Sequence, residues 1–208
     1  MRVQGALATA LIVATLGLTA CSGEQPDPGP TITTVAAPSP SPTPTPSARP
    51  TPSPSPEAAE FDASVPPKSP KGLSGPPSSD AALEVAQYFM SLFPYAQATG
   101  DLEAWNSLSG EFCDYCANAG DMVEDLPEGQ HSVGGRIEFT ETRATEIRAG
   151  EYGVLLRFTE HPSATLDASG AVVEDFPKTS RVVADMHVVW RDGRWSIEAA
   201  AVDLRGQT

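Results

Sequence analysis

The sequence predicts an α+β domain in which N-terminal helices pack on one face of an antiparallel sheet, preceded by a signal peptide and a disordered proline-rich linker. Three observations support this prediction. An apolar run ends at Cys21, 17 of the 21 prolines lie between residues 22 and 79, and the hydrophobic periodicity changes from helical to alternating after Gly134-Gly135. These changes divide the chain into a signal peptide, a linker and one domain, at residues 1–20, 21–79 and 80–208.

The first 21 residues have the pattern of a bacterial lipoprotein signal. Arg2 supplies a positive charge, and residues 6–18 form an uncharged core of 13 residues, which is too short to cross a bilayer as a stable helix. The sequence Leu-Thr-Ala-Cys that ends at Cys21 resembles the lipobox, in which the cysteine thiol is acylated and the peptide is cut ahead of it. We therefore expect lipid such as palmitate on Cys21 to anchor the chain to the outer face of the bacterial cytoplasmic membrane. An ordinary secretory signal with an incidental cysteine is the alternative.

The linker lacks the apolar residues that a hydrophobic core needs. Between Pro38 and Pro56, proline alternates almost strictly with serine or threonine. Such a run favours a semi-rigid polyproline II helix, at about 3.1 Å per residue or roughly 60 Å in all, because proline fixes φ and restrains the residue before it. We expect this spacer to hold the domain away from the membrane, either bare or O-glycosylated on its serines and threonines.

Charge is distributed unevenly along the domain. Residues 80–135 contain ten Asp or Glu and no Lys or Arg, whereas residues 136–208 carry 12 acidic and nine basic residues. Nucleic-acid binding depends on basic patches that release counterions, so we expect no nucleic-acid partner. The acidic half is either a solvated helical surface, which is the commoner case, or a face for a cation or a basic partner.

The acidic half predicts three helices. In the first, apolar residues recur at spacings of three and four: Ala82, Leu83, Ala86, Phe89, Met90, Phe93 and Ala96. Asp80 or Ser79 is the expected N-cap, Gly100 marks the end, and Pro94 should kink or restart the helix because proline removes a backbone hydrogen bond. The second helix has Asp101 as its N-cap and turns Leu102, Trp105 and Leu108 inward, and the third covers Cys113 to Leu126.

Beyond Gly135 the pattern alternates with period two, as in strands with one buried face. The buried faces of the two clearest strands comprise Tyr152, Val154, Leu156 and Phe158, and then Val182, Ala184, Met186, Val188 and Trp190. Asp192-Gly193 between two such runs predicts a type I′ hairpin turn, whose central residues need positive φ. Weaker strands are expected at 136–139 and 142–148, and residues 161–178 are expected to form a long loop or a distorted hairpin.

Several short motifs follow one another in the domain: Ala98-Thr99-Gly100-Asp101, Leu108-Ser109, Cys113-x-x-Cys116, Gly134-Gly135 and a closing Trp-x-Asp-Gly-x-Trp hairpin. Their order and spacing, behind the signal and linker, resemble actinobacterial lipoproteins that end in a domain of unknown function, the family numbered 6318. The resemblance implies a curved, cone-shaped fold similar to nuclear transport factor 2, the shape shared by polyketide cyclases, scytalone dehydratase and ketosteroid isomerase. The family has no established activity, so the resemblance implies no catalytic residue. Pro94 departs from the family's pattern.

The Cys113-Asp-Tyr-Cys116 motif allows three interpretations. With Cys21 lipidated, Cys113 and Cys116 remain as an even pair in an oxidising compartment, which favours a structural disulfide. A redox-active pair would need a stabilised thiolate, which the neighbouring Glu111 and Asp114 disfavour. Zinc needs about four ligands, and no second Cys or His pair is suitably spaced, so we expect no metal and no other cofactor.

No catalytic set stands out in the sequence. Asp185 and His187 lie two apart in a strand, so their side chains leave the face opposite the predicted core. A solvated surface pair is the expected outcome, and an acid–histidine dyad is the alternative. His131 and His161 fall near turns, and the chain has neither a Gly-x-Ser-x-Gly nucleophile elbow nor a phosphate-binding glycine loop.

In a cone-shaped fold the cavity lies between the helices and the concave sheet. Five aromatic residues are candidates to line that cavity or to fill it: Phe89, Tyr95, Trp105, Phe158 and Trp195. The favoured function is a non-enzymatic envelope lipoprotein whose domain binds a small hydrophobic ligand or an envelope protein. The alternative is an isomerase-, dehydratase- or cyclase-like enzyme, for which Asp101 and Glu138 are unsupported candidates as an inward carboxylate.

Overall fold

The computed structural model describes residues 53–54 and 56–208 of the chain. The predicted signal peptide, the lipidation site Cys21 and most of the proline-rich linker lie outside the described residues. The described helices are α1 (Pro56–Glu60), the 3₁₀ helix η1 (Lys71–Leu73), α2 (Ser79–Thr99), α3 (Glu103–Leu108) and α4 (Asp114–Glu124). Among them, none has both the length and the apolar character needed to span a bilayer.

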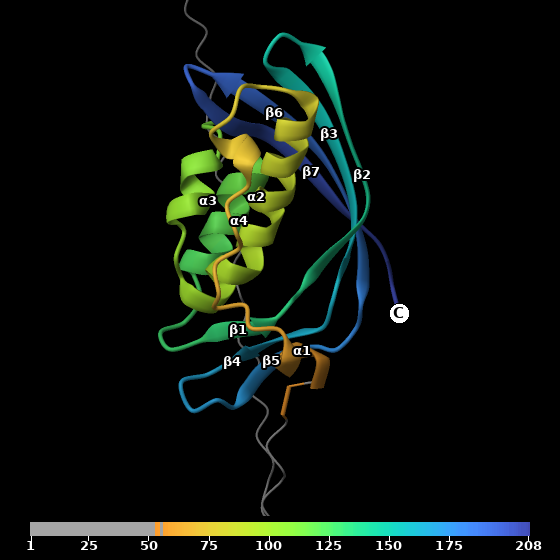
Figure 1. The fold of residues 1–208 in the computed structure, drawn as a ribbon. Helices are drawn as coiled ribbons and strands as arrows, with labels where there is room; N and C mark the ends of the chain where they lie inside the picture. The colour runs from red at the N-terminus through yellow and green to blue at the C-terminus, as the bar shows by residue number, and fades with distance from the viewer. Residues whose placement is uncertain (1–52, 55) are drawn as a thin grey trace, which may run out of the picture. The chain divides into compact units, whose positions relative to one another are not determined.

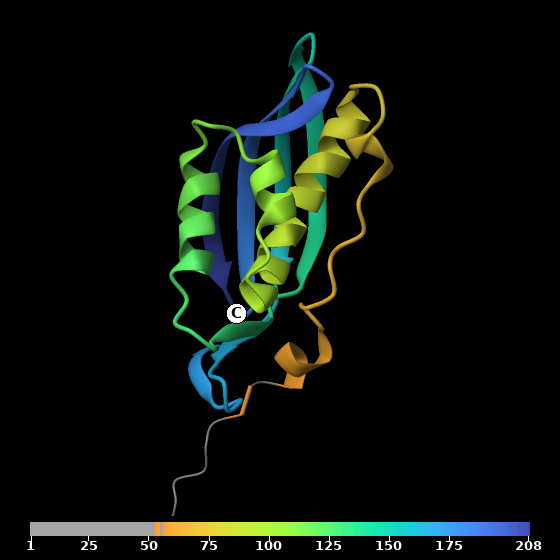
Figure 2. The ribbon, with the colours of Figure 1, turned by 90° about the vertical axis from the view of Figure 1, so that its left-hand side faces the viewer.

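Two antiparallel sheets follow the helices in the chain (Figure 1). The larger sheet has the order β2-β3-β6-β7, with β2 (Ile137–Arg148), β3 (Glu151–Glu160), β6 (Ser180–Arg191) and β7 (Arg194–Gln207). The smaller sheet has the order β1-β4-β5, with β1 (His131–Gly134), β4 (Ser163–Leu166) and β5 (Val172–Phe176). Helices α2, α3 and α4 cover one face of the larger sheet, and the smaller sheet lies across one end of it (Figure 2). The predicted α+β class, with helices on one face of a curved antiparallel sheet, is confirmed.

Both ends of α2 are set by local chemistry. Ser78, in an extended conformation, is the N-cap, and its Oγ accepts a hydrogen bond from the Ala81 N–H at 3.1 Å. The predicted caps Asp80 and Ser79 are therefore wrong by one or two residues. Both lie in the first turn, where the Asp80 carboxylate complements the positive end of the helix. Gly100 ends the helix in the left-handed conformation, with φ of 75°, as predicted.

α2 runs through Pro94 without a break, so the prediction of a restart there is wrong. Proline in a helix interior costs roughly 3 kcal/mol, because it removes one hydrogen bond and crowds the preceding turn. Side chains on both sides of Pro94 are buried in the core: Phe89, Met90 and Leu92 before it and Ala96 after it. Burial of each large side chain contributes about 1.5–3 kcal/mol, which together exceeds the cost of the proline.

The two shorter helices lie close to their predicted positions. The N-cap of α3 is Leu102, so the predicted cap Asp101 is wrong by one residue. The Asp101 carboxylate nevertheless accepts a hydrogen bond from the Glu103 N–H at 3.0 Å, just before the helix begins. Trp105 and Leu108 are buried, as the spacing predicted. α4 begins one residue later and ends two residues earlier than predicted.

The larger sheet confirms the predicted alternation up to Val188, beyond which Val189 is also buried and Trp190 is only partly buried. Even-numbered residues are buried beneath the helices from 152 to 158 on β3 and from 182 to 188 on β6. Asp192 and Gly193 have φ of 53° and 78°, both positive as the predicted type I′ turn requires. The two weaker strands predicted before β3 are one strand, β2, with a register shift between Phe139 and Glu141.

The smaller sheet is the part that the sequence predicted least well. Residues 161–178 contain β4 and β5, whose register shifts between Thr165 and Leu166, so the distorted-hairpin alternative is correct. The Asp167 carboxylate closes the turn by accepting a hydrogen bond from the Ser169 N–H at 2.8 Å. β1, which the sequence did not predict as a strand, pairs with the other edge of β4. Strands of four or five residues give too short an alternation to be recognised from sequence.

Residues 56–78, which the sequence assigned to the linker, pack on the domain, and we call them the N-terminal strap (Figure 2). The indole N–H of Trp195 donates to the Gly72 carbonyl at 2.8 Å. The Gly72 N–H in turn donates to the Glu84 carboxylate at 2.9 Å. These two hydrogen bonds tie the strap to β7 and to α2, so the packed domain begins well before the expected boundary at residue 80.

The core lies between the helices and the larger sheet. Phe89 of α2 stacks on Trp105 of α3 with ring centroids 4.0 Å apart. The Trp105 indole N–H donates to the Cys116 carbonyl at 3.0 Å, which joins α3 to α4. Tyr152 of β3 and Trp195 of β7 lie 5.6 Å apart between their centroids. Aromatic contacts of this kind close the interior beneath the helices.

Deleting residues 56–77 from the chain that begins at Ser22 is expected to destabilise the domain. In the undeleted chain, Trp195→Phe removes the hydrogen bond to Gly72 and costs about 1 kcal/mol in the free energy of unfolding. In the deleted chain the acceptor is already absent, so the same substitution costs less. Chemical denaturation of the four proteins measures both costs. Equal costs in the two backgrounds would contradict the proposed role of Trp195 in holding the strap.

Candidate functional site

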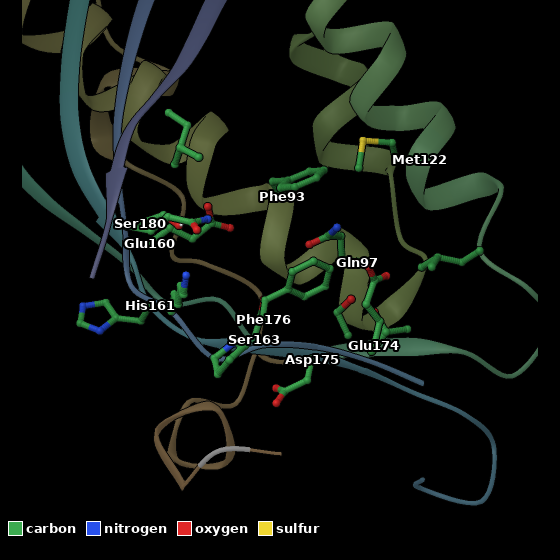
Figure 3. Close-up of a pocket in the computed structure, with 17 residues that line it drawn as sticks. Phe93, Gln97, Met122, Glu160, His161, Ser163, Glu174, Asp175, Phe176 and Ser180 are labelled. Atoms are coloured by element: carbon green, nitrogen blue, oxygen red, sulfur yellow. Dashed lines mark hydrogen bonds between the residues drawn. The ribbon is translucent and has the colours of Figure 1, made fainter. Parts of the chain in front are cut away.

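A cavity of about 600 Å³ opens where α2 and α4 meet the smaller sheet (Figure 3). Its apolar lining consists of Phe93, Met122, Leu126, Phe176, Pro177 and Leu204. Its polar lining includes Gln97, Ser132, Glu160, Ser163, Thr165, Glu174, Ser180 and Gln207. The volume lies within the range of about 300–1,000 Å³ typical of small-molecule sites, and the mixed lining is also typical of them.

Glu160 is the carboxylate that strand geometry places in this cavity. The even-numbered residues of β3 face the helices, and after Phe158 the next of them is Glu160. Its Cα partners are Ile137 on β2 and Ser180 on β6, so Glu160 lies where the apolar core ends and the cavity begins. The sequence analysis missed Glu160, although the same alternation that identified the core face of β3 could have found it.

Glu160 has an unusual environment for a carboxylate. Burial raises the pKa of Glu160 above its ordinary value. Within the described part of the chain, its carboxylate has no hydrogen-bond or ion-pair partner. Burial first, and then the nearby charge of Glu160, raise the pKa of Tyr115 on α4 to about 12. A carboxylate of this kind can hold a proton, transfer it, or pair with a cation that enters the cavity.

His161, the next residue, turns away from Glu160 at the rim of the cavity (Figure 3). Its ring lies 3.0 Å from the Arg136 guanidinium and 3.2 Å from the Glu138 carboxylate. Glu138 is exposed and pairs with Arg136 at 3.3 Å. Glu138 is therefore not the inward carboxylate that the enzyme alternative requires.

Four of the five candidate liners fill the core instead: Phe89, Trp105, Phe158 and Trp195 are each at most 4% exposed. Phe89 and Trp105 stack on each other, Phe158 packs on Phe139 and Trp195 on Tyr152, and all four belong to the core beneath the helices. Tyr95 lines a separate pocket beside the strap, and its hydroxyl donates to the Asp101 carboxylate at 2.8 Å. Hydrogen bonds from the Glu103 N–H and from Tyr95 lower the pKa of Asp101, which is exposed at the start of α3.

Cys113 and Cys116 form a disulfide at the start of α4. Both cysteines are 2% exposed, and the Cys116 Sγ lies 3.7 Å from the Ile197 carbonyl on β7. The bridge is thus part of the core and not of the cavity, which agrees with the structural interpretation of the motif. Closing so short a loop contributes about 2 kcal/mol in the chain-entropy model. The disulfide also fixes the start of α4, whose Met122 lines the cavity.

Asp185 and His187 do not form an acid–histidine dyad. His187 lies 3.0 Å from the Glu151 carboxylate, and Arg148 contacts the same carboxylate at 2.8 Å. The hydrogen bond from Arg148, assisted by the one from His187, lowers the pKa of Glu151. This cluster and the exposed Asp185 lie on the face of the sheet away from the helices, so they take no part in the cavity.

Comparison with known proteins places the domain in a family. Residues 62–201 match the model of a family of unknown function, DUF6318. The chain belongs to this family. The membership of family 6318 that the sequence motifs indicated is thereby confirmed. No curated protein matches the chain.

Several solved structures are similar to this chain at low sequence identity. A hexachlorocyclohexane dehydrochlorinase, LinA type 2, is 11% identical over 60% of this chain and 85% of its own, with a TM-score of 0.41. The intermembrane-space region of the chloroplast protein ARC6 is 9% identical over 62% of this chain and 99% of its own, with a TM-score of 0.47. A putative scytalone dehydratase from Novosphingobium aromaticivorans is 12% identical over 60% of this chain and 84% of its own, with a TM-score of 0.40. Likeness at this level, with TM-scores below 0.5, carries no argument about this chain.

Glu160→Gln is expected to stabilise the folded chain at neutral pH. Because folding raises the pKa of Glu160, the folded state binds its proton more tightly than the unfolded state, whose pKa is about 4.3. The contribution of Glu160 to stability therefore falls as the pH rises from the unfolded pKa to the higher folded pKa. The advantage of Glu160→Gln should grow over that window and then stay constant.

Thermal unfolding between about pH 3 and pH 8 measures this advantage. Glu124→Gln, at an exposed position on α4, is the control for removal of one negative charge. If the advantage of Glu160→Gln had the same size at every pH, a charge buried in the cavity would not be its cause.

Proposed function

We propose that this protein is a lipid-anchored envelope protein whose domain binds a small, largely apolar molecule in the cavity beside Glu160. The observation that carries the proposal is a cavity of about 600 Å³ that the core aromatics leave open. An interior filled throughout would offer no such site. Among the buried candidate liners, Trp105 packs against Phe93 of the cavity lining, whereas Trp195 lies beside Tyr152 at the other end of β3.

Apolar side chains exposed at the cavity support binding. Met122, Phe176 and Leu204 are 60%, 48% and 58% exposed, although large apolar side chains are usually buried. These three come from α4, β5 and β7, yet they line one opening. A ligand that covers them would gain about 25 cal/mol for each Å² of apolar surface removed from water.

Polar groups converge on the same space and would orient the ligand. Gln97 projects from α2, while Glu160 and Ser180 are adjacent across β3 and β6 (Figure 3). A few polar groups within a largely apolar lining are what gives a small-molecule site its specificity. The proposed ligand therefore has an apolar body and at least one polar group.

The location rests on the sequence. The motif ending at Cys21 supports lipidation, and the proline-rich linker supports display of the domain at a distance from the membrane.

In a bacterial host that processes lipoproteins, Cys21→Ala is expected to move the protein from the membrane fraction to the soluble exported fraction. Mass spectrometry of the N-terminal peptide should find an acylated cysteine in the unsubstituted protein. A free amino terminus and an unmodified thiol at Cys21 would contradict the anchor.

Binding can be tested with a neutral probe such as 2-naphthol, because the natural ligand is unidentified. We expect chemical-shift changes in the NMR spectrum of the exported chain to cluster on residues that line the cavity. Gln97→Trp adds bulk inside the cavity and should abolish them. Asn106→Trp makes a comparable change at an exposed position on α3 and should leave them intact. Changes scattered over the surface, or equally affected by both substitutions, would contradict a binding cavity.

A second candidate, an enzyme that transfers a proton in the cavity, is favoured by one observation. The pKa of Glu160 is raised by burial, as a general acid or base requires. For a molecule that co-purifies with the chain, this function predicts exchange of a carbon-bound hydrogen with solvent deuterium, and loss of the exchange in Glu160→Gln. If the molecule binds but no hydrogen exchanges, the enzyme function is wrong and only the binding function remains.

A further inference from the structure

The residues around Glu160 indicate which chemical class of ligand the cavity binds. The inference about that class rests on the proposed binding function. Glu160 has no cationic partner among the described residues, although it lies partly buried next to the core. A buried carboxylate is stabilised most by an opposite charge that approaches within a few ångströms. A cation that enters the cavity would supply that opposite charge to Glu160.

Two aromatic rings border the space next to this carboxylate. Figure 3 shows Phe93 of α2 on one side of the cavity and Phe176 of β5 on the other, with Gln97 at the side. Phe93 is held in place by Trp105, whose ring centroid lies 5.8 Å away. The faces of aromatic rings attract organic cations, by about 0.5–2 kcal/mol for each well-placed ring.

The surroundings of the opening are acidic. Strand alternation puts Glu174 on the same face of β5 as Phe176, while Asp175 points away (Figure 3). Asp121, Glu124 and Asp125, which are near Met122 in the sequence but do not line the cavity, add exposed carboxylates at the C-terminal end of α4. Lys178 is the lysine among the residues that line the cavity, and it is exposed. The resulting negative potential favours entry of cations and opposes entry of anions.

A bare metal ion does not fit this site. Within residues 53–54 and 56–208, no group of three or more His, Cys, Asp or Glu side chains is placed to hold a metal. An apolar, aromatic lining of this size also suits a carbon skeleton better than a hydrated ion.

We propose that the ligand is an organic cation with an apolar body, such as an amine or a quaternary ammonium compound. Its charged group pairs with the Glu160 carboxylate between the faces of Phe93 and Phe176. Its apolar body covers Met122 and Leu204 toward the opening. Glu174 adds a second negative charge on the same side of the cavity.

The test compares three probes with the same phenylbutyl body: 4-phenylbutyltrimethylammonium, 4-phenylbutan-1-ol and 4-phenylbutanoate. The ammonium ion is a permanent cation, so its own charge does not change with pH. Calorimetric titration of the exported chain at about pH 8 should show the cation binding about tenfold more tightly than the alcohol, and the anion most weakly. The other titratable residues that line the cavity are His161, Glu174, Asp175 and Lys178, and Tyr115 lies close enough to respond to the charge of Glu160.

Substitutions identify the charge responsible. Glu160→Gln should reduce the affinity for the cation about tenfold and leave that for the alcohol unchanged, whereas Lys178→Gln should increase affinity for the cation. Asp185→Asn removes one negative charge from the far face of the sheet and is the matched control, with no expected effect.

The outcomes separate this inference from the function on which it rests. If the alcohol or the anion binds as well as the cation, or if Glu160→Gln weakens the cation and the alcohol equally, the cation inference is wrong and the binding cavity stands. If none of the three probes binds, the proposed binding function is overturned as well.

Discussion

The strict alternation of side chains along β3 is the constraint on which the rest of the molecule depends. Four inward residues, from Tyr152 to Phe158, complete the core beneath the helices. The fifth inward residue is Glu160, and the same geometry that buries its predecessors turns its carboxylate toward the helices. A shift of one residue in register would move the apolar set to the outer face, so the position of Glu160 is as firmly determined as the core.

The space around Glu160 exists because separate elements border it without filling it. α2 and α4 cover the core, and both also contribute residues to the cavity beside Glu160. The smaller sheet lies across that end of the larger sheet and borders the cavity on another side. The Cys113–Cys116 disulfide fixes the start of α4 against β7. The strap, held by Gly72 between Trp195 and Glu84, supports α2 from the other side. α2, α4 and the two sheets thus border a cavity that their side chains leave open.

The sequence predicted the elements whose signals are long and local. The helical spacing before Gly100, the alternation of β3 and β6, and the Asp-Gly hairpin turn each follow from the chemistry of neighbouring residues. The smaller sheet, the strap and the cavity depend on contacts between distant segments, such as Trp195 with Gly72, which no local pattern records. The aromatic candidates were chosen only because they are aromatic, and an aromatic side chain can equally line a cavity or fill the core. Glu160 could have been found, because it continues the alternation of β3 by one more step.

The measurement that tests the central claim most directly is a crystal structure of the exported chain, combined with native mass spectrometry of the same preparation. The account predicts an open cavity between Phe93 and Phe176, with any co-purified molecule bound there against Glu160. Native mass spectrometry would give the mass of that molecule. Side chains of Phe176 and Leu204 folded into the space, leaving no room for a ligand and Glu160 buried beneath them, would contradict the account.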